Sequence, residues 1–446
     1  MLQFQLIDLR LRYHHTIFRW TKINHNFGDS LHLLNHSISI QIGNIPPSKE
    51  LFLKLENAFL VASTHEIIEI VSFKSNIEIE LRGWARLRGH LYLGRETLKQ
   101  QYSYKIQKIS QNEFTNKPSW GKKMKGIDSA NPKLKDLELS DEILSKAPDS
   151  NGLMTRGMVA QENTPVYDFE LSHKEQVWSQ SVSSLYEEGK HAQWNATTDI
   201  AWNEIPTLNP IMEQAVCQIM TYLVENEFSA LYIPGKFISK INPYYMEVPL
   251  FLSSLMNDEA RHIEVFTKRA NANGGGFQYS SEVTQRSLYS LFKEDDYLKS
   301  SFLLHVMGEG TFIDLLSFLE KHLPDETTRK IIKLSKRDEI RHVAYGMEHV
   351  KSAIEQNPNR INALKNSAFQ RKEFMDEVSS ESSMLLESLA ILAGGSDAPA
   401  DYKRGFDLVE ELKKTMNENR IKRLIQIGMD EDLAHDISKV HTPNFM

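Results

Sequence analysis

The sequence has one cysteine, Cys217, in 446 residues. A single thiol cannot form a disulfide within the chain, and it cannot supply the ligands of a cysteine-bound iron–sulfur cluster or zinc ribbon. This scarcity of cysteine is most consistent with a reducing, cytoplasmic location.

Long apolar runs and an excess of basic residues are also absent. The amino-terminal stretch MLQFQLIDLRLRYHH mixes charges into its apolar positions, unlike a signal peptide. No uninterrupted apolar run approaches the roughly 18–20 residues that cross a bilayer. Lys and Arg total 52 against 59 Asp and Glu, which disfavours a basic nucleic-acid-binding surface. We therefore expect a soluble protein without nucleic-acid or membrane partners.

The chain divides by pattern into four regions. Residues 1–105 contain strand-like alternation at 37–43, 65–73 and 76–94 around a helical stretch, which predicts a small α+β region of unknown role. Residues 106–170 are polar and predict a linker or loosely packed loop. Residues 171–356 predict a four-helix bundle preceded by a leading helix, and residues 357–446 predict a helical extension.

Four long helices are predicted in the bundle. The first begins near Asn209 and runs until Pro234 interrupts it, and the second begins between Asn242 and Pro249 and stops before residue 271. The third covers about 297–321, and the fourth is capped near Asp325 and reaches about Gln356. A link of some 25 residues between the second and third helices suits a crossover in a four-helix bundle.

The pattern Asp-Glu-x-Arg-His occurs twice, at residues 258–262 and 338–342. Glu and His three residues apart lie on one helix face and can bind the same ion. This predicts Glu259, His262, Glu339 and His342 as metal ligands. Two further Glu-x-x-His matches, at 170–173 and 188–191, lack the flanking Asp and Arg and are interpreted as surface residues.

The Asp and Arg of the repeated pattern predict supporting roles. Asp258 and Asp338 are placed to accept the imidazole N–H that faces away from a metal, which fixes the orientation of the ring. Arg261 and Arg341 point to another side and are expected to pair with carboxylates outside the metal shell.

A carboxylate-bound pair of metals also needs one Glu from each of two other helices. Glu309 lies in an otherwise apolar segment, and Glu227 lies on the apolar face of the first helix, with Glu225 as the alternative. Glu227 precedes Glu259 by 32 residues, and Glu309 precedes Glu339 by 30. Four carboxylates and two imidazoles favour redox-active, hard ions such as iron or manganese over a three-ligand catalytic zinc.

These residues resemble the ferritin-like di-iron carboxylate superfamily, in its oxygen-activating branch. The repeated motif is similar to that of multicomponent monooxygenase hydroxylase subunits and acyl-carrier-protein desaturases, and N-oxygenases share the superfamily. The resemblance covers about residues 205–355. It implies a mainly α, ferritin-like four-helix bundle and the ligands listed here: Glu227, Glu259, His262, Glu309, Glu339 and His342.

Several positions depart from the relatives. Phe266 occupies the place of the radical tyrosine of ribonucleotide reductase small subunits, and Ile313 that of a monooxygenase threonine. Ser335 replaces the extra histidine of the N-oxygenases. His305, one turn before Glu309, is either an additional ligand or supporting base or a satisfied core histidine. Trp194 is expected to anchor a helix on the bundle, with a role beside the site as the alternative.

The resemblance implies an O2-dependent oxidoreductase. We expect two Fe ions, cycling between Fe2+ and Fe3+, with Mn/Fe as the alternative and O2 as co-substrate. The predicted reaction is hydroxylation or N-oxygenation of a small organic substrate. The alternatives are desaturation, a ribonucleotide-reductase-like radical role and ferroxidase activity. Expected partners are an external electron donor, a ferredoxin or a flavin reductase, and, as an alternative to a monomer, a second copy in a homodimer.

Overall fold

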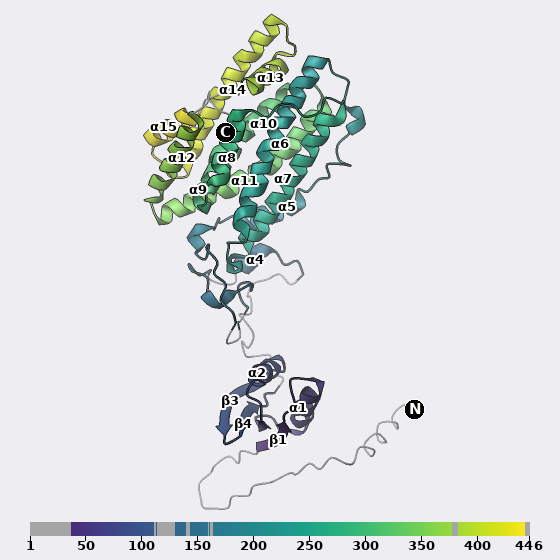
Figure 1. Cartoon of the computed structure of the whole chain (residues 1–446), viewed down its shortest axis with the longest axis vertical. Helices are drawn as coiled ribbons and strands as arrows, with labels where there is room; N and C mark the ends of the chain where they lie inside the picture. Colours follow the sequence, from purple (N-terminus) through teal and green to yellow (C-terminus); the bar gives the residue numbers. More distant parts are fainter. Residues whose placement is uncertain are drawn as a thin grey trace, which may run out of the picture. The chain divides into compact units, whose positions relative to one another are not determined.

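The computed structural model of the chain describes residues 37–110, 113, 130–139, 143–158, 160, 164–376 and 382–441. Residues 1–36, which begin the region predicted as α+β, lie outside the described residues. The chain forms two compact units, residues 1–119 and 120–446 (Figure 1).

The first unit is a small α+β fold, as predicted. Its described strands form one sheet in the order β1-β2-β4-β3, with β1 parallel to β2 and the other pairs antiparallel. The elements are β1 (Ser37–Gly43), α1 (Lys49–Val61), β2 (Ile67–Ser72), α2 (Glu78–Leu87), β3 (Leu91–Leu98) and β4 (Gln101–Gln107). Its core includes Leu51, Leu55, Ile68, Ile70, Leu81, Trp84, Tyr104 and Ile106.

The strand predicted over residues 76–94 is wrong in its first half. Residues Glu78–Leu87 form helix α2, and only Leu91–Leu98 form a strand. Leu81, Trp84 and Ala85 are buried with the i, i+3, i+4 spacing of one helix face. The first residues of the segment alternate between apolar and polar, which is typical of a strand. The helical spacing becomes visible only when Leu81, Trp84 and Ala85 are included.

The second unit is built on a four-helix bundle, which confirms the predicted fold class (Figure 1). Its helices are α6 (Pro210–Ile238), α7 (Glu247–Ala272), the continuous run of α9 (Tyr297–Ser301), η5 (Phe302–Glu309) and α10 (Gly310–His322), and α11 (Glu326–Gln356). Helix α7 packs on α6, and α11 packs on α10 and η5. Asn209 caps α6 by accepting the Met212 N–H, and Asp325 caps α11 by accepting the Thr328 N–H.

Two details of the bundle differ from the prediction. Helix α6 continues through Pro234 to Ile238 instead of ending there. The third helix changes to π-helical geometry over Phe302–Glu309, with a wider turn than the flanking α-helices. Single π-helical turns occur often at functional sites, and this segment carries Glu309.

Shorter elements cover the bundle. Before it lie α4 (Leu134–Leu139), η1 (Asp149–Asn151), η2 (Lys174–Gln176), α5 (Val182–His191) and η3 (Trp202–Glu204), and η4 (Pro243–Tyr245) precedes α7. Helix α8 (Glu282–Lys293) lies in the predicted crossover. The carboxyl-terminal helices are α12 (Arg360–Asp376), α13 (Ser383–Gly394), α14 (Pro399–Gln426) and α15 (Glu431–His441).

Part of the segment predicted as linker or loosely packed loop packs against the bundle instead. Arg156 and Glu247 form a buried ion pair, with 3.2 Å between Arg156 Nη1 and Glu247 Oε2. Arg156 also donates to the Tyr244 carbonyl at 3.1 Å. A polar composition predicted a loop, and the buried pairing that holds it could not be read from one sequence.

Among the described helices, one stretch, Tyr297–His322, is long and apolar enough to cross a membrane. It is the third helix of the bundle, and 72% of its most apolar window is buried inside the protein. Packing in the core therefore accounts for its apolar composition.

Candidate metal centre

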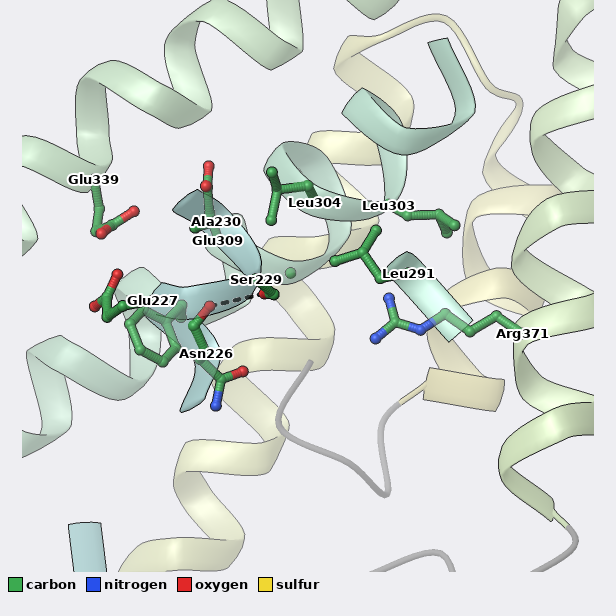
Figure 2. A pocket seen from close by; sticks show the side chains of 12 residues that line it. Asn226, Glu227, Ser229, Ala230, Leu291, Leu303, Leu304, Glu309, Glu339 and Arg371 are labelled. Atoms are coloured by element: carbon green, nitrogen blue, oxygen red, sulfur yellow. Dashed lines mark hydrogen bonds between the residues drawn. The ribbon is translucent and has the colours of Figure 1, made fainter. Parts of the chain in front are cut away.

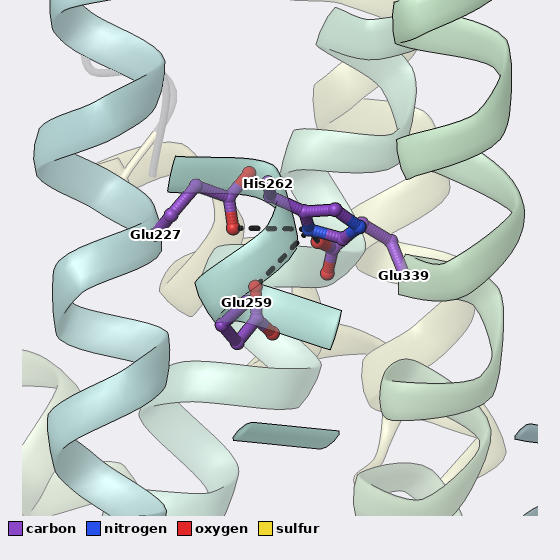
Figure 3. Close-up of side chains that lie close together, drawn as sticks. All are labelled: Glu227, Glu259, His262 and Glu339. Carbon is purple, nitrogen blue, oxygen red and sulfur yellow. Dashed lines mark hydrogen bonds and ion pairs between the residues drawn. The ribbon is translucent and has the colours of Figure 1, made fainter. Parts of the chain in front are cut away.

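Two acidic residues and one histidine of the repeated motif converge with an acid from α6 in the centre of the bundle. Glu259 and His262 come from α7, Glu339 comes from α11, and Glu227 comes from α6 (Figure 3). The His262 Nδ1 atom lies 3.2 Å from Glu259 Oε2, 3.5 Å from Glu227 Oε2 and 3.2 Å from Glu339 Oε1. All four side chains are buried.

A second group overlaps the first. Glu259 and Glu339 belong to it as well, together with Glu309 from η5 and His342 from α11. His342 Nδ1 lies 2.9 Å from Glu259 Oε1 and 3.3 Å from Glu339 Oε2. In each group the potential ligand atoms all lie within 4.8 Å of one another. The two groups would hold two ions, with Glu259 and Glu339 common to both groups and one further glutamate and one histidine in each.

The residues fit a metal pair because one buried oxygen of each glutamate accepts no hydrogen bond, and where it faces a neighbour that neighbour is the Nδ1 of a candidate ligand histidine. The Oε1 atoms of Glu227, Glu259, Glu309 and Glu339 are buried and accept no hydrogen bond from the described residues. Leaving such an atom unsatisfied costs about 1–3 kcal/mol, and more for a charged group. One oxygen on each of the four glutamates is thus available to bind a cation.

The charges of the cluster also favour bound metal ions. Burial and the charges of Glu259 and Glu339 raise the pKa of Glu227 well above its ordinary value. Burial would lower the pKa of His262, but the charge of the Glu227 carboxylate and the hydrogen bonds that His262 donates to Asp338 and the glutamates raise it well above the usual range. Burial also raises the pKa of Glu309, so without a cation Glu227 and Glu309 retain their protons more readily than exposed glutamates. Metal ions would offset the negative charges of the glutamates.

The supporting aspartates pair across the bundle. Asp338 Oδ2 lies 3.4 Å from His262 Nε2, and Asp258 Oδ2 lies 3.4 Å from His342 Nε2. Each Asp therefore faces the histidine of the other motif. The spacing of four residues within one motif does not reveal this pairing. In this arrangement each imidazole donates Nε2–H to Asp and leaves Nδ1 facing the glutamates.

Both arginines join the two aspartates. Arg261 Nη2 donates to Asp258 Oδ1 at 2.5 Å and to Asp338 Oδ2 at 2.9 Å. Arg341 Nη2 donates to Asp258 Oδ2 at 2.9 Å and to Asp338 Oδ1 at 2.7 Å. These two guanidinium groups neutralise two buried carboxylates that would otherwise repel each other, and they connect α7 to α11 next to the histidines.

Residues before the bundle also reach this network. Trp194 Nε1–H donates to Asp338 Oδ2 at 2.7 Å, and the Arg261 guanidinium lies over the Trp194 ring at 4.8 Å. Gln193 donates to Asp258 at 3.1 Å and accepts from Arg261 at 2.7 Å. Trp194 thus has the contact beside the site that the sequence left as an alternative. Gln193 was missed, since an isolated glutamine carries no motif.

His305 and Glu225, the two other candidates from the sequence, lie outside the two ligand groups. His305 Nδ1 lies 2.6 Å from Glu309 Oε2, and His305 is not among the residues of either overlapping group. Gly346 on α11 leaves room for the His305 ring, because a Cβ atom there would overlap the imidazole. Glu225 lies away from the cluster and accepts a hydrogen bond from Gln285 at 3.2 Å.

A narrow cavity adjoins the cluster (Figure 2). Glu227, Glu309 and Glu339 line it on one side, and its volume is about 30 Å³. Its other walls are mainly apolar, from residues on α6, α8, η5 and α10: Ala230, Leu291, Leu303, Leu304 and Phe312. Arg371 on α12 also lines the cavity. No motif or pattern in the sequence marks Arg371, which lies in an ordinary polar helix outside the bundle.

The comparisons with known proteins find structural likeness only. No protein-family model and no curated protein sequence matches the chain. Solved structures of two variants of an R2-like ligand-binding oxidase with an aerobically reconstituted Mn/Fe cofactor are each 17% identical to it, with TM-scores of 0.45. These likenesses cover 56% of this chain and 95% and 98% of those chains.

Proposed function

We propose that the protein is a di-iron, O2-dependent oxidoreductase that hydroxylates or N-oxygenates a small organic substrate. The observation that carries the proposal is the pair of overlapping ligand groups with four unpartnered buried carboxylate oxygens. The adjoining apolar cavity supports it, because a substrate there would lie directly against three of the glutamates.

Iron is the proposed metal because of the ligand atoms. Carboxylate oxygens and imidazole nitrogens in this ratio suit Fe and Mn, whereas zinc and copper sites use more histidine or thiolate. We propose two Fe ions, with a mixed Mn/Fe pair as the alternative. When bound, such a pair supplies the electron exchange with O2 that no protein side chain in the site provides.

The side chains of the site would hold the two metal ions, and the residues around them orient these ligands. Asp338 and Asp258 accept Nε2–H from His262 and His342, which aims each Nδ1 at the glutamates, where it would give up its proton to bind a metal ion. Arg261 and Arg341 keep the aspartates ionised and fixed. Glu227 faces His262 through Oε2 and has no hydrogen-bond partner at Oε1, which leaves that oxygen open to a metal ion. Leu304 and Phe312 supply apolar walls to the adjoining cavity.

The proposed reaction requires an electron donor. Hydroxylation inserts one oxygen atom of O2 into a C–H bond, whereas N-oxygenation adds one oxygen atom to a nitrogen. In both reactions the other oxygen atom leaves as water. This balance consumes two electrons and two protons. The single cysteine, Cys217, is buried and cannot hold an iron–sulfur cluster. We propose that a ferredoxin or flavin reductase delivers the electrons, in a reducing, cytoplasmic setting, to a monomer or a homodimer.

Anaerobic loading with Fe(II) followed by exposure to O2 tests the proposal. We expect rapid O2 consumption, a transient change in the optical spectrum, and oxygen from labelled O2 in the product. Loss of two hydrogens without oxygen incorporation would show desaturation, and a persistent protein radical by electron paramagnetic resonance would show a radical role. Uptake of many irons per chain would show ferroxidase storage. A loaded protein that does not consume O2 contradicts the proposal.

A further inference from the structure

A buried, unpaired arginine lies at the cavity beside the metal centre. Arg371 is 3% exposed, and its Nη2 donates to Ser287 Oγ at 2.6 Å. Its Nε and Nη1 atoms are buried and have no hydrogen-bond partner among the described residues. Figure 2 shows the Arg371 guanidinium directed toward Leu291 and Asn226, into the cavity.

The charge of Arg371 is not neutralised by the part of the chain that the structure describes. No Asp or Glu forms an ion pair with it, unlike Arg261, Arg269 and Arg341. Burial lowers the pKa of Arg371 to about 10, so the group remains cationic at neutral pH. A buried unpaired charge costs several kcal/mol. A water molecule would satisfy the N–H groups but would leave the charge in place.

Arg371 and Leu303 separate the inner cavity from the outside. Both residues line the inner cavity, and both also line a surface pocket of about 460 Å³ between α8 and α12. The rings of Tyr289 and Phe374 flank this outer pocket. Lys293, Glu294 and Asp295 line the outer pocket as well. A molecule that passed from it between Arg371 and Leu303 would meet the guanidinium before it reached Glu227 and Glu309.

We infer that the substrate is a slim carboxylic acid whose carboxylate binds Arg371 and whose apolar end extends along Leu303 and Leu304 toward the metal ligands. This inference rests on the proposed function and names its substrate class. Either free donor of the guanidinium, Nε–H or Nη1–H, can donate to a carboxylate oxygen, and one monoanion neutralises one arginine. The inner cavity is only about twice the volume that one water requires, which restricts the inserted end to a narrow group.

The arrangement also fixes where oxidation would occur. A carboxylate held at Arg371 keeps its own carbon away from Glu227, Glu309 and Glu339. The far end of the acid lies nearest to these ligands. Oxygen is therefore inserted at a carbon or nitrogen remote from the carboxylate, with the balance of electrons and protons given above.

Calorimetric titration of the full-length protein tests the inference. The probes are acetate, butyrate, hexanoate and octanoate, each with the primary alcohol of the same length, and the protein is used both metal-loaded and metal-free. Because a carboxylate can also bind iron, the metal-free protein isolates the contribution of Arg371. We expect at least one acid to bind, and its alcohol to bind about 10- to 100-fold more weakly.

Variants at Arg371 make the test specific. Arg371→Met should weaken acid binding about 10- to 100-fold and leave alcohol binding unchanged, and Arg371→Lys should recover part of it. Arg329→Met, which removes an arginine paired with Glu326 on α11, is the control and should bind like the wild type. Arg371→Met should also raise the melting temperature of the ligand-free protein, because it removes an uncompensated buried charge.

Three results would overturn the inference. They are no binding by any acid of the series, equal binding of acid and alcohol, and a loss of stability in Arg371→Met that marks a structural arginine. A different result would contradict the proposed function, namely that the iron-loaded protein does not consume O2. Acid binding to the metal-free protein would remain in that case.

Discussion

The imidazole of His262 on α7 faces the carboxylate of Asp338 on α11, with 3.4 Å between His262 Nε2 and Asp338 Oδ2. The reciprocal pair, His342 and Asp258, has the same separation. Each copy of the motif therefore supports the metal ligand of the other, and neither half of the site is complete alone. The exchange makes the orientation of both histidines depend on the packing of α7 against α11.

The exchange predicts which ion responds to a mutation. Asp338→Asn should weaken binding at the ion held by Glu227 and His262, because it replaces the charged carboxylate that fixes that ring with a neutral amide. Asp258→Asn should instead affect the ion held by Glu309 and His342. Loss of such a partner lowers metal affinity about 10- to 100-fold. Mössbauer spectra of the two variants, each loaded with one equivalent of iron-57, distinguish the sites. Identical effects on both ions would contradict the pairing.

Glu227 and Glu225 provide a matched pair of variants. Glu227→Gln should lower the bound iron by about one ion per chain, because Glu227 contributes to only one of the two groups. It should also stabilise the metal-free protein, since it removes an acid from a repelling buried cluster. Glu225→Gln should retain the wild-type iron content, because Glu225 faces Gln285. Elemental analysis and thermal unfolding measure both effects, and equal iron in the two variants would reject Glu227 as a ligand.

Several of these relationships were visible in the sequence and others were not. The helical spacing of apolar residues and caps such as Asn209 and Asp325 predict the four bundle helices. The repeated motif marks two of them as carrying metal ligands. The exchange between Asp338 and His262 depends on the relative register of two helices, which spacing within one helix does not specify. Arg371 is conspicuous only through its burial, and the π-helical turn at Glu309 has no signature in local composition.

His349 should make the metal-free protein less stable at acid pH. Its Nε2 donates to the Gln176 carbonyl at 2.8 Å and its Nδ1 faces Ser301 Oγ at 3.0 Å. Burial lowers the pKa of His349 to about 3, from about 6.5 in an unfolded chain. Its contribution to stability is therefore complete above pH 6.5 and is lost as the pH falls toward 3, by about 1.4 kcal/mol per pH unit.

Urea unfolding at pH 7.5 and 5.5, with a chelator present, checks this dependence. His349→Gln should reduce the loss of stability at pH 5.5, whereas the control His435→Gln, at a side chain 58% exposed, should not. The groups around His349 are the rings of Tyr297 and Tyr345 and, through their charges, His305 and Arg360. An unchanged pH slope in His349→Gln would assign the effect to another group.

The buried pair of Arg156 and Glu247 should hold residues before the bundle against α7. Arg156→Met leaves the Glu247 charge buried and should lower the free energy of unfolding by about 3–5 kcal/mol. Adding Glu247→Leu should recover much of that loss, because it removes the stranded charge. Denaturant titration of the single and double variants measures the coupling. Additive effects would show that the two residues act independently.

Metal stoichiometry tests the central claim most directly. The full-length protein, reconstituted anaerobically with Fe(II) and freed of loosely bound metal, should hold two irons per chain by elemental analysis. The double variant Glu259→Gln, Glu339→Gln, which removes both shared carboxylates, should hold almost none. Two irons in the wild type with loss in the double variant is the predicted result. Fewer than about one iron per wild-type chain, or equal iron in the variant, would contradict a two-metal centre at these residues.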